Sequence, residues 1–168
     1  MAIRDALLPE FDNEMATTRK TLERVPEDKV NWKPHEKSMA MGYLAQLVAT
    51  MPDWIAMMVL QDQLDLRPVS GPAYKAAATD TRAQLLAVQD AAAKKSLDAL
   101  RQTSDEHLAT HWKLLAGGHV VLDQPRHEAI ADTLTHLAHH RGQLTVYLRL
   151  NDAPVPKVYG PSADDKSF

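Results

Sequence analysis

The chain has 168 residues, 19 basic and 22 acidic side chains, a formal net charge of −3 and no cysteine. This length suffices for one domain with its own core, over residues 1–168, and the missing cysteine excludes a disulfide or a thiolate supplied by the protein. Because no basic stripe accumulates along the chain, the composition argues against nucleic acid and against an anionic membrane as partners.

The N-terminal segment MAIRDALLPEFDNEM lacks the apolar core of a signal peptide. No later run is expected to reach the roughly 20 apolar residues that a bilayer span needs. These features predict a cytoplasmic protein without a membrane segment.

The first helix is predicted between Leu7 and Val25, where apolar residues recur at spacings of three, four and seven. The residues on this face are Leu8, Phe11, Met15, Leu22 and Val25. Pro26 ends the helix. The connector that follows carries Trp32, whose large apolar ring we expect to pack on the helices.

A second helix is predicted from Ser38, as its N-cap, through Met58, because apolar residues alternate by three and four. Pro52 lies inside this pattern, so we expect a kink about one turn earlier, near Val48. The following segment, QDQLDLRPVSGPAYKAAA, holds two prolines and a glycine and is predicted to be a long loop.

A third helix is predicted from Asp80 or Thr81 through Leu100, with Thr81 and Gln84 at the spacing of a capping box. The segment TSDEHL ends it. The next segment, HWKLLAGGHVVLDQP, has Gly117 and Gly118 between two short apolar runs. This pattern indicates either a two-stranded excursion or an extended loop.

The fourth helix is predicted from Pro125, in its first turn, to Asn151, and the tail APVPKVYGPSADDKSF is expected to lie extended over the surface. Its apolar face consists of Ile130, Leu134, Leu137, Leu144 and Leu148. Four amphipathic segments without a comparable set of strands predict an all-α four-helix bundle.

The stretch THLAHHRGQ places His136 and His140 four residues apart, on one stripe of the fourth helix. Two imidazoles at this spacing can bind one divalent ion, although a useful site needs a third protein ligand. The alternative is a hydrogen-bonded or solvated pair. His139 is predicted to point away from this pair, and Arg141 to pair with an acidic residue of another helix. The remaining histidines are predicted to be solvated: His35, His107, His111, His119 and His127.

Two long stretches, NWKPHEKSMAMGYLAQLVATMPDW and LTHLAHHRGQLTVYLRLNDAPVPKVYGPSADD, resemble the DinB-like superfamily of damage-inducible and YfiT-type four-helix bundles. The loop HWKLLAGGHVV also fits. The resemblance implies an up-down-down-up bundle with long loops and a small extended excursion before the last helix. It also implies a divalent metal, often nickel or zinc, held by one histidine of the second helix and two of the last.

Carried over to this chain, the two ligands of the last helix fall on His136 and His140. In the second helix, GYLAQLVAT has Leu47 where the family pattern G-x-L-A-x-H has its histidine. Leucine cannot coordinate a metal, and the neighbouring Gln46, about 100° around the helix, offers only a poor carboxamide ligand. Water, another Glu or His such as His119, or a partner subunit would have to complete the site.

The resemblance implies two functional hypotheses of different classes. In the first, the protein is a thiol-dependent S-transferase in which a metal favours the thiolate of a low-molecular-weight thiol, which attacks an electrophile. Gln143 or Tyr147 would then position a substrate group. In the second, Leu47 fills the former metal position, and the bundle is a non-catalytic module that binds a small ligand or a protein. Homodimers are common in the family, so a homodimer is expected.

Overall fold

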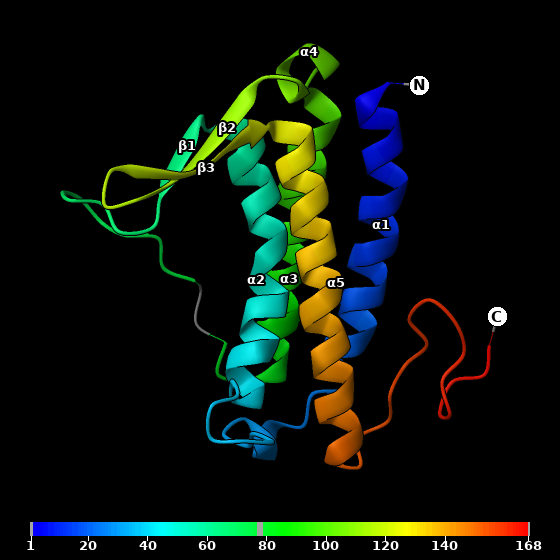
Figure 1. Cartoon of the computed structure of the whole chain (residues 1–168). Coiled ribbons are helices and arrows are strands. Elements are labelled where there is room, and N and C mark those ends of the chain that lie inside the picture. Colours follow the sequence, from blue (N-terminus) through cyan, green and yellow to red (C-terminus); the bar gives the residue numbers. More distant parts are fainter. Residues whose placement is uncertain (1, 77–78, 168) are drawn as a thin grey trace.

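The computed structural model describes residues 2–76 and 79–167 and is mostly helical, with a small three-stranded sheet. The long helices are α1 (Ile3–Leu22), α2 (Met41–Leu60), α3 (Arg82–Gln102) and α5 (Arg126–Leu150). They lie side by side, with α1 and α5 running in one direction and α2 and α3 in the other (Figure 1). Two short helical segments complete this part of the chain: η1 (Glu27–Lys29) and α4 (Asp105–Leu108).

The apolar core lies between the long helices, and α2 contributes most to it. Among the described residues, α2 alone is long and apolar enough to cross a bilayer, with a mean hydropathy of 1.3, and the sequence prediction overlooked it. Within the fold, 67% of this apolar window is buried. Burial of this kind is expected of the central helix of a folded domain, because its side chains pack on neighbouring helices.

The start of α2 differs from the prediction, because the helix begins at Met41 and Ser38 is not its N-cap. The preceding connector satisfies the first amides of the helix instead. The Met41 amide donates to the Trp32 carbonyl and the Gly42 amide to the Val30 carbonyl, each at 2.8 Å. Glycine permits this approach, since a Cβ at position 42 would lie 3.0 Å from Cβ of Val30.

α2 continues through Pro52 with the help of a hydroxyl group from α3. Oγ of Ser96 donates to the Pro52 carbonyl at 2.5 Å and accepts from the Ala56 amide at 3.1 Å. The hydroxyl therefore bridges two groups that stand in the i→i−4 relation of an α-helix, and it ties α3 to α2.

The other helix termini show one predicted feature and two corrections. The capping box of α3 is confirmed, since Thr81 and Gln84 bond each other's amides. α5 begins at Arg126, with Pro125 as N-cap. α1 begins at Ile3, four residues before the predicted start at Leu7. The chain beyond Asn151 lies beside α1 (Figure 1), but it is not extended throughout as predicted, because it folds back so that Oγ of Ser162 donates to the Val155 carbonyl at 2.6 Å.

The sheet has the strand order β1-β2-β3, with β1 (Gln63–Asp65), β2 (His111–Ala116) and β3 (His119–Pro125). β2 and β3 form an antiparallel hairpin, so the two-stranded form of the predicted excursion is confirmed. Its turn is Gly117–Gly118, whose φ angles of 63° and 80° favour glycine. β1 runs parallel to β2 and pairs Leu64 with Leu114. The all-α prediction is therefore wrong in this region, and the predicted long loop after α2 contains a strand.

Candidate functional site

His136 and His140 lie one turn apart on α5 and contact each other directly. Their Nε2 atoms are 2.9 Å apart and their ring centroids 4.6 Å apart. Nδ1 of His140 lies 2.8 Å from Oε1 of Gln143. Because a carboxamide oxygen only accepts, Nδ1 of His140 carries the proton of this hydrogen bond. In the neutral ring Nε2 then carries no proton, and it accepts a hydrogen bond from Nε2–H of His136.

His139 belongs to the same hydrogen-bond chain, which corrects the prediction that it points away. Its Nε2 lies 3.1 Å from Nε2 of Gln143, and its ring meets that of His140 edge-on at 5.1 Å. The amide of Gln143 therefore connects two histidines, through its oxygen to His140 and through its nitrogen to His139. All of these side chains come from two turns of α5.

The pKa of His136 is lowered from 6.5, first by burial and then by the positive charge that His140 and His139 carry when protonated. His136 is therefore neutral at pH 7. A neutral imidazole can donate a hydrogen bond to its partner or offer a lone pair to a metal.

The two Nε2 atoms have the separation of two ligands on one ion. Nitrogen ligands at about 2.0–2.1 Å from a metal, with an angle of about 90–109° between them, lie about 2.8–3.4 Å apart. However, residues 2–76 and 79–167 contain no group of three His, Cys, Asp or Glu side chains arranged to hold a metal. His119, considered as a replacement ligand, is exposed beside the hairpin turn. The donor set therefore does not match the three-histidine site that the resemblance implies.

Leu47 and His140 both lie between two contacts that join the region of α2 to α5. The contacts are Trp54 of α2 with His136, at 6.0 Å between ring centroids, and Met39, just before α2, with Tyr147, at 3.2 Å between carbonyl and hydroxyl. Leu47 is half-buried and packs against the apolar core. Hydrocarbon thus occupies position 47, where the resemblance implies a third histidine.

Tyr147, which the transferase hypothesis gives a role in positioning a substrate, packs within the fold. It is buried, its ring meets Trp32 edge-on at 5.3 Å, and its hydroxyl donates to the Met39 carbonyl. The predicted packing of Trp32 on the helices is thereby confirmed. Four of the histidines predicted to be solvated have hydrogen-bond partners of their own. His107 contacts the Val59 carbonyl at 2.9 Å and His127 the Leu108 carbonyl at 3.0 Å, while the exposed His111 contacts Oδ1 of Asp123 at 2.7 Å and the exposed His35 accepts from the Lys37 amide at 3.2 Å.

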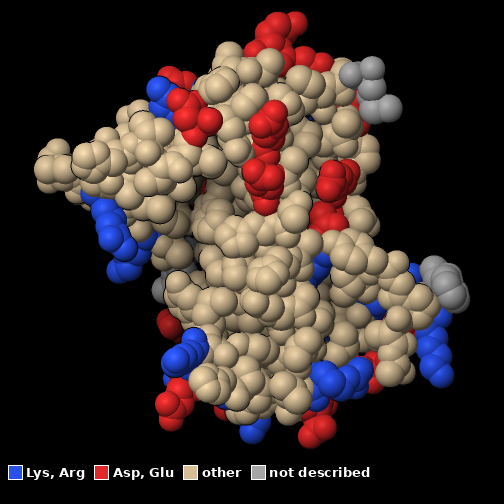
Figure 2. Space-filling view, in the orientation of Figure 1, with Lys and Arg blue, Asp and Glu red and all other residues tan. Residues whose placement is uncertain are grey.

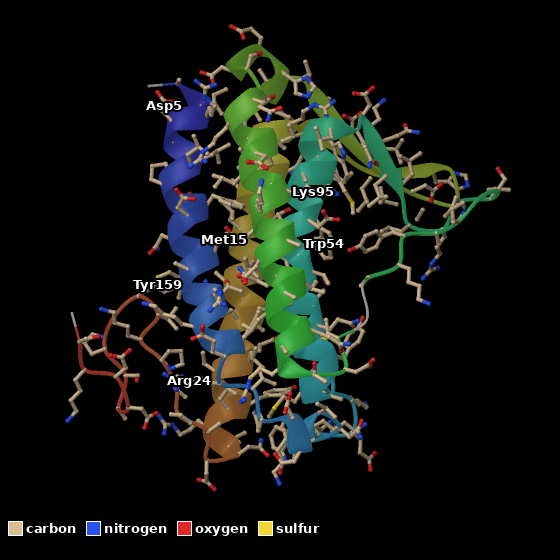
Figure 3. All side chains as sticks on the ribbon, turned by 180° about the vertical axis from the view of Figure 1, so that it is seen from behind. Asp5, Met15, Arg24, Trp54, Lys95 and Tyr159 are labelled. Atoms are coloured by element: carbon tan, nitrogen blue, oxygen red, sulfur yellow. The ribbon has the colours of Figure 1, made fainter. Side chains whose placement is uncertain are left out.

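A pocket of about 360 Å³ lies beside the histidines, between α2, α5 and the sheet. Trp54 and His136, which contact each other, both line it, and Trp54 projects from α2 on the side of the helices opposite the tail residue Tyr159 (Figure 3). Most of the wall is apolar: Met57, Met58, Leu64, Leu66, Trp112, Leu114 and Leu122. Its polar side chains include Gln124, Asp132 and Thr133.

The strand β1 forms part of this pocket and is held in place by Asp65. The carboxylate accepts from the Gly117 amide at 3.0 Å, the Gly118 amide at 2.7 Å and the Arg67 amide at 2.9 Å. These bonds, led by that of Arg67, lower the pKa of Asp65. Sequence reasoning missed the pocket, because the strand that forms one wall is only three residues long and lies in a segment predicted to be a loop.

Comparison with known proteins identifies the family. The model of the DinB family matches residues 4–167. The chain belongs to the DinB family. Its fold is similar to those of two DinB-like proteins, one from Bacillus cereus ATCC 10987 and one from Bacillus subtilis. No match was found among the curated proteins.

Both structural likenesses extend over nearly whole chains. The Bacillus cereus protein gives a TM-score of 0.73 at 19% identity, covering 92% of this chain and 97% of the other. The Bacillus subtilis protein gives a TM-score of 0.68 at 19% identity, covering 96% and 99%. At these identities the likeness shows the fold alone. The predicted DinB resemblance is confirmed, and the chemistry of this DinB-family protein has to be inferred from its own residues.

Proposed function

We propose that this DinB-family protein binds a small, mainly apolar molecule in the pocket between α2, α5 and the sheet. The observation that carries the proposal is the pocket itself, whose volume of about 360 Å³ lies in the range of small-molecule sites. Its wall combines aromatic and aliphatic side chains with a few polar groups, which is the usual composition of such sites. A binding role requires no third metal ligand, so it is compatible with Leu47.

Calorimetric titration with a neutral apolar probe, 4-phenylbutan-1-ol, tests this proposal. Leu122 lines the pocket from β3, and its neighbour Val121 is 59% exposed. Because successive side chains of a strand point to opposite faces, Leu122→Trp fills the pocket, whereas the matched control Val121→Trp leaves it open. We expect the wild type and the control to bind the probe alike, and Leu122→Trp to bind it about tenfold or more weakly. Equal binding by all three proteins, or binding by none, would contradict the proposal.

A second candidate function is metal-dependent transfer of a low-molecular-weight thiol to an electrophile. It is supported by the 2.9 Å separation of the Nε2 atoms of His136 and His140, which suits two ligands of one nickel or zinc ion. A bound divalent ion would favour the thiolate form of the thiol, which this chain, without cysteine, has to obtain from a cosubstrate.

Elemental analysis by mass spectrometry tests the second candidate. Untagged protein purified without chelators is compared with the variant His136→Ala/His140→Ala. This candidate predicts near-stoichiometric nickel or zinc in the wild type and its loss in the double variant. Metal-free samples of both proteins would contradict the metal-dependent function and leave the binding function as the proposal.

A further inference from the structure

The charge of the pocket points to the class of its ligand. Among the described residues that line it, Asp132 is the one acidic side chain, and none is Lys or Arg. Nε2 of Gln124 donates to Oδ2 of Asp132 at 2.9 Å, so a second lining residue holds the carboxylate in place. A fixed carboxylate beside a mainly apolar cavity attracts a cation and repels an anion.

The aromatic residues of the wall favour the same kind of ligand. Trp54 comes from α2, Trp112 from β2 and Tyr74 from the segment after β1, so aromatic rings border the pocket from three elements. The face of an aromatic ring carries partial negative charge and attracts an ammonium group within about 6 Å of its centre. A wall with aromatic rings and one carboxylate therefore suits a ligand that has an ammonium group and a hydrocarbon part.

The first turns of α5 also carry negative charge. The first two turns of α5 carry its two acidic residues, Glu128 and Asp132, whereas Arg126 and Arg141 of the same helix are buried. Figure 2 shows acidic side chains over the upper half of the helical part, whereas acidic and basic side chains are mixed in the lower half and basic ones also lie on the projecting part at the left. A cation approaching this end of α5 therefore meets a favourable potential.

We propose that the ligand of this pocket is a small organic cation, an alkyl- or arylalkylamine whose ammonium group pairs with Asp132 and whose hydrocarbon part fills the apolar cavity. The proposal rests on the proposed binding function, because it assigns a ligand class to the same pocket. It identifies Asp132 as the residue that determines charge specificity.

Three probes share the 4-phenylbutyl group and differ only in the charge of the terminal group: 4-phenylbutylamine, 4-phenylbutan-1-ol and 4-phenylbutanoate. Comparing them separates the contribution of charge to the affinity from that of apolar contact. Each is titrated calorimetrically at pH 7 and low salt. We expect the amine to bind about tenfold more tightly than the alcohol, and the carboxylate more weakly than either. Asp132→Asn should abolish the advantage of the amine and leave the affinity for the alcohol unchanged.

Glu128→Gln is the matched control, because it removes one negative charge from α5 one turn before Asp132, at a position outside the pocket wall. This variant should keep the preference for the amine, and circular dichroism should show both variants folded. Equal affinity of the wild type for amine and alcohol would overturn the inference while the binding function stands. An amine preference that survives Asp132→Asn would also overturn it. Failure of all three probes to bind would overturn the binding function as well.

Discussion

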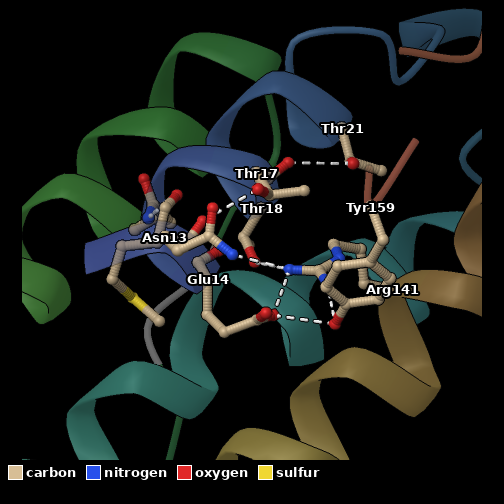
Figure 4. Close-up of polar contacts among 9 residues, drawn as sticks. Asn13, Glu14, Thr17, Thr18, Thr21, Arg141 and Tyr159 are labelled. Atoms are coloured by element: carbon tan, nitrogen blue, oxygen red, sulfur yellow. Dashed lines mark hydrogen bonds and ion pairs between the residues drawn. The ribbon is translucent and has the colours of Figure 1, made fainter. Parts of the chain in front are cut away.

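Arg141 of α5 and Glu14 of α1 form a buried ion pair, with 2.6 Å between Nη1 and Oε2. Arg141 also donates to Oγ1 of Thr18 at 3.2 Å and to the hydroxyl of Tyr159 at 2.6 Å (Figure 4). The hydroxyl of Tyr159 in turn donates to Glu14 at 3.2 Å. The predicted pairing of Arg141 with an acidic residue of another helix is therefore confirmed. The cluster joins the first long helix, the last long helix and the tail.

Replacement of one partner should destabilise the fold strongly, because it leaves the other charge buried without compensation. We expect Arg141→Met to lower the free energy of unfolding by about 3–5 kcal/mol, and Glu14→Leu/Arg141→Met to restore much of the loss. Urea unfolding followed by circular dichroism measures both effects. The control Arg149→Met removes a half-exposed pair with Asp164 and should cost at most about 1 kcal/mol. If Arg141→Met were as mild as this control, the ion pair would have no special role in stability.

Tyr159→Phe should loosen the tail without unfolding the helices. The substitution removes the hydroxyl that bonds Arg141 and Glu14, but it keeps the ring, which lies 5.2 Å from the guanidinium carbon of Arg141. We expect limited proteolysis, followed by mass spectrometry, to cut the tail after Asn151 severalfold faster than in the wild type, with the helices still protected. Tyr43→Phe, on an exposed tyrosine of α2, is the control and should leave the cleavage rate unchanged.

The long helices could be predicted from the sequence, because the residue pattern that indicates a helix lies within the helix itself. The three-and-four spacing of apolar residues predicted the four long helices. The capping box at Thr81 and the glycine pair at positions 117 and 118 predicted a helix start and a hairpin turn, since each depends on neighbouring residues.

The features that escaped prediction depend on partners far along the chain. α1 begins at Ile3 because the carboxylate of Asp105, 102 residues away, accepts from its amide at 2.9 Å. β1 consists of three residues and exists through its pairing with β2, about 50 residues later. No local pattern marks either contact, because each appears only when the helices have brought distant segments together.

The same distinction applies to the site. Spacing alone predicted that His136 and His140 share one stripe of a helix, and the structure brings their Nε2 atoms together. The inclusion of His139 in the chain depends on the rotamer of Gln143, and the pocket depends on how the sheet covers α2 and α5. Rotamers and packing of this kind have no signature in a single sequence.

The pKa of His136 should rise toward 6.5 when its neighbours lose their charge. In metal-free protein, His140→Gln should raise it more than His139→Gln, because His140 is the stronger of the two charged neighbours that lower it. Nuclear magnetic resonance titration of the imidazole protons measures this. The folded pKa lies below the unfolded value, so wild-type stability should fall as the pH drops from about 6.5 through the folded pKa. An unchanged pKa in His140→Gln would contradict the proximity of the two rings.

An exposed apolar stripe on α5 supports the proposal that the protein is a homodimer. Val146 and Leu150 are four residues apart, and 56% and 57% of their surfaces are exposed. We expect sedimentation velocity to show a dimer for the wild type and a monomer for Val146→Glu/Leu150→Glu, because charges on this stripe would be buried against each other. Val120→Glu/Val121→Glu, with similarly exposed valines on β3, is the control. A monomeric wild type would contradict the proposal.

Leu47→His should restore a third ligand and raise the affinity for nickel or zinc. Position 47 and His140 lie between the same two contacts, and the two Nε2 atoms already have a separation that suits one ion. A third imidazole should therefore strengthen binding about tenfold or more in a calorimetric titration. Gln46→His is the matched control, because it adds the same side chain about 100° around α2 and should give little gain. If the control gained more affinity than Leu47→His, or if neither gained any, position 47 would not face the two histidines.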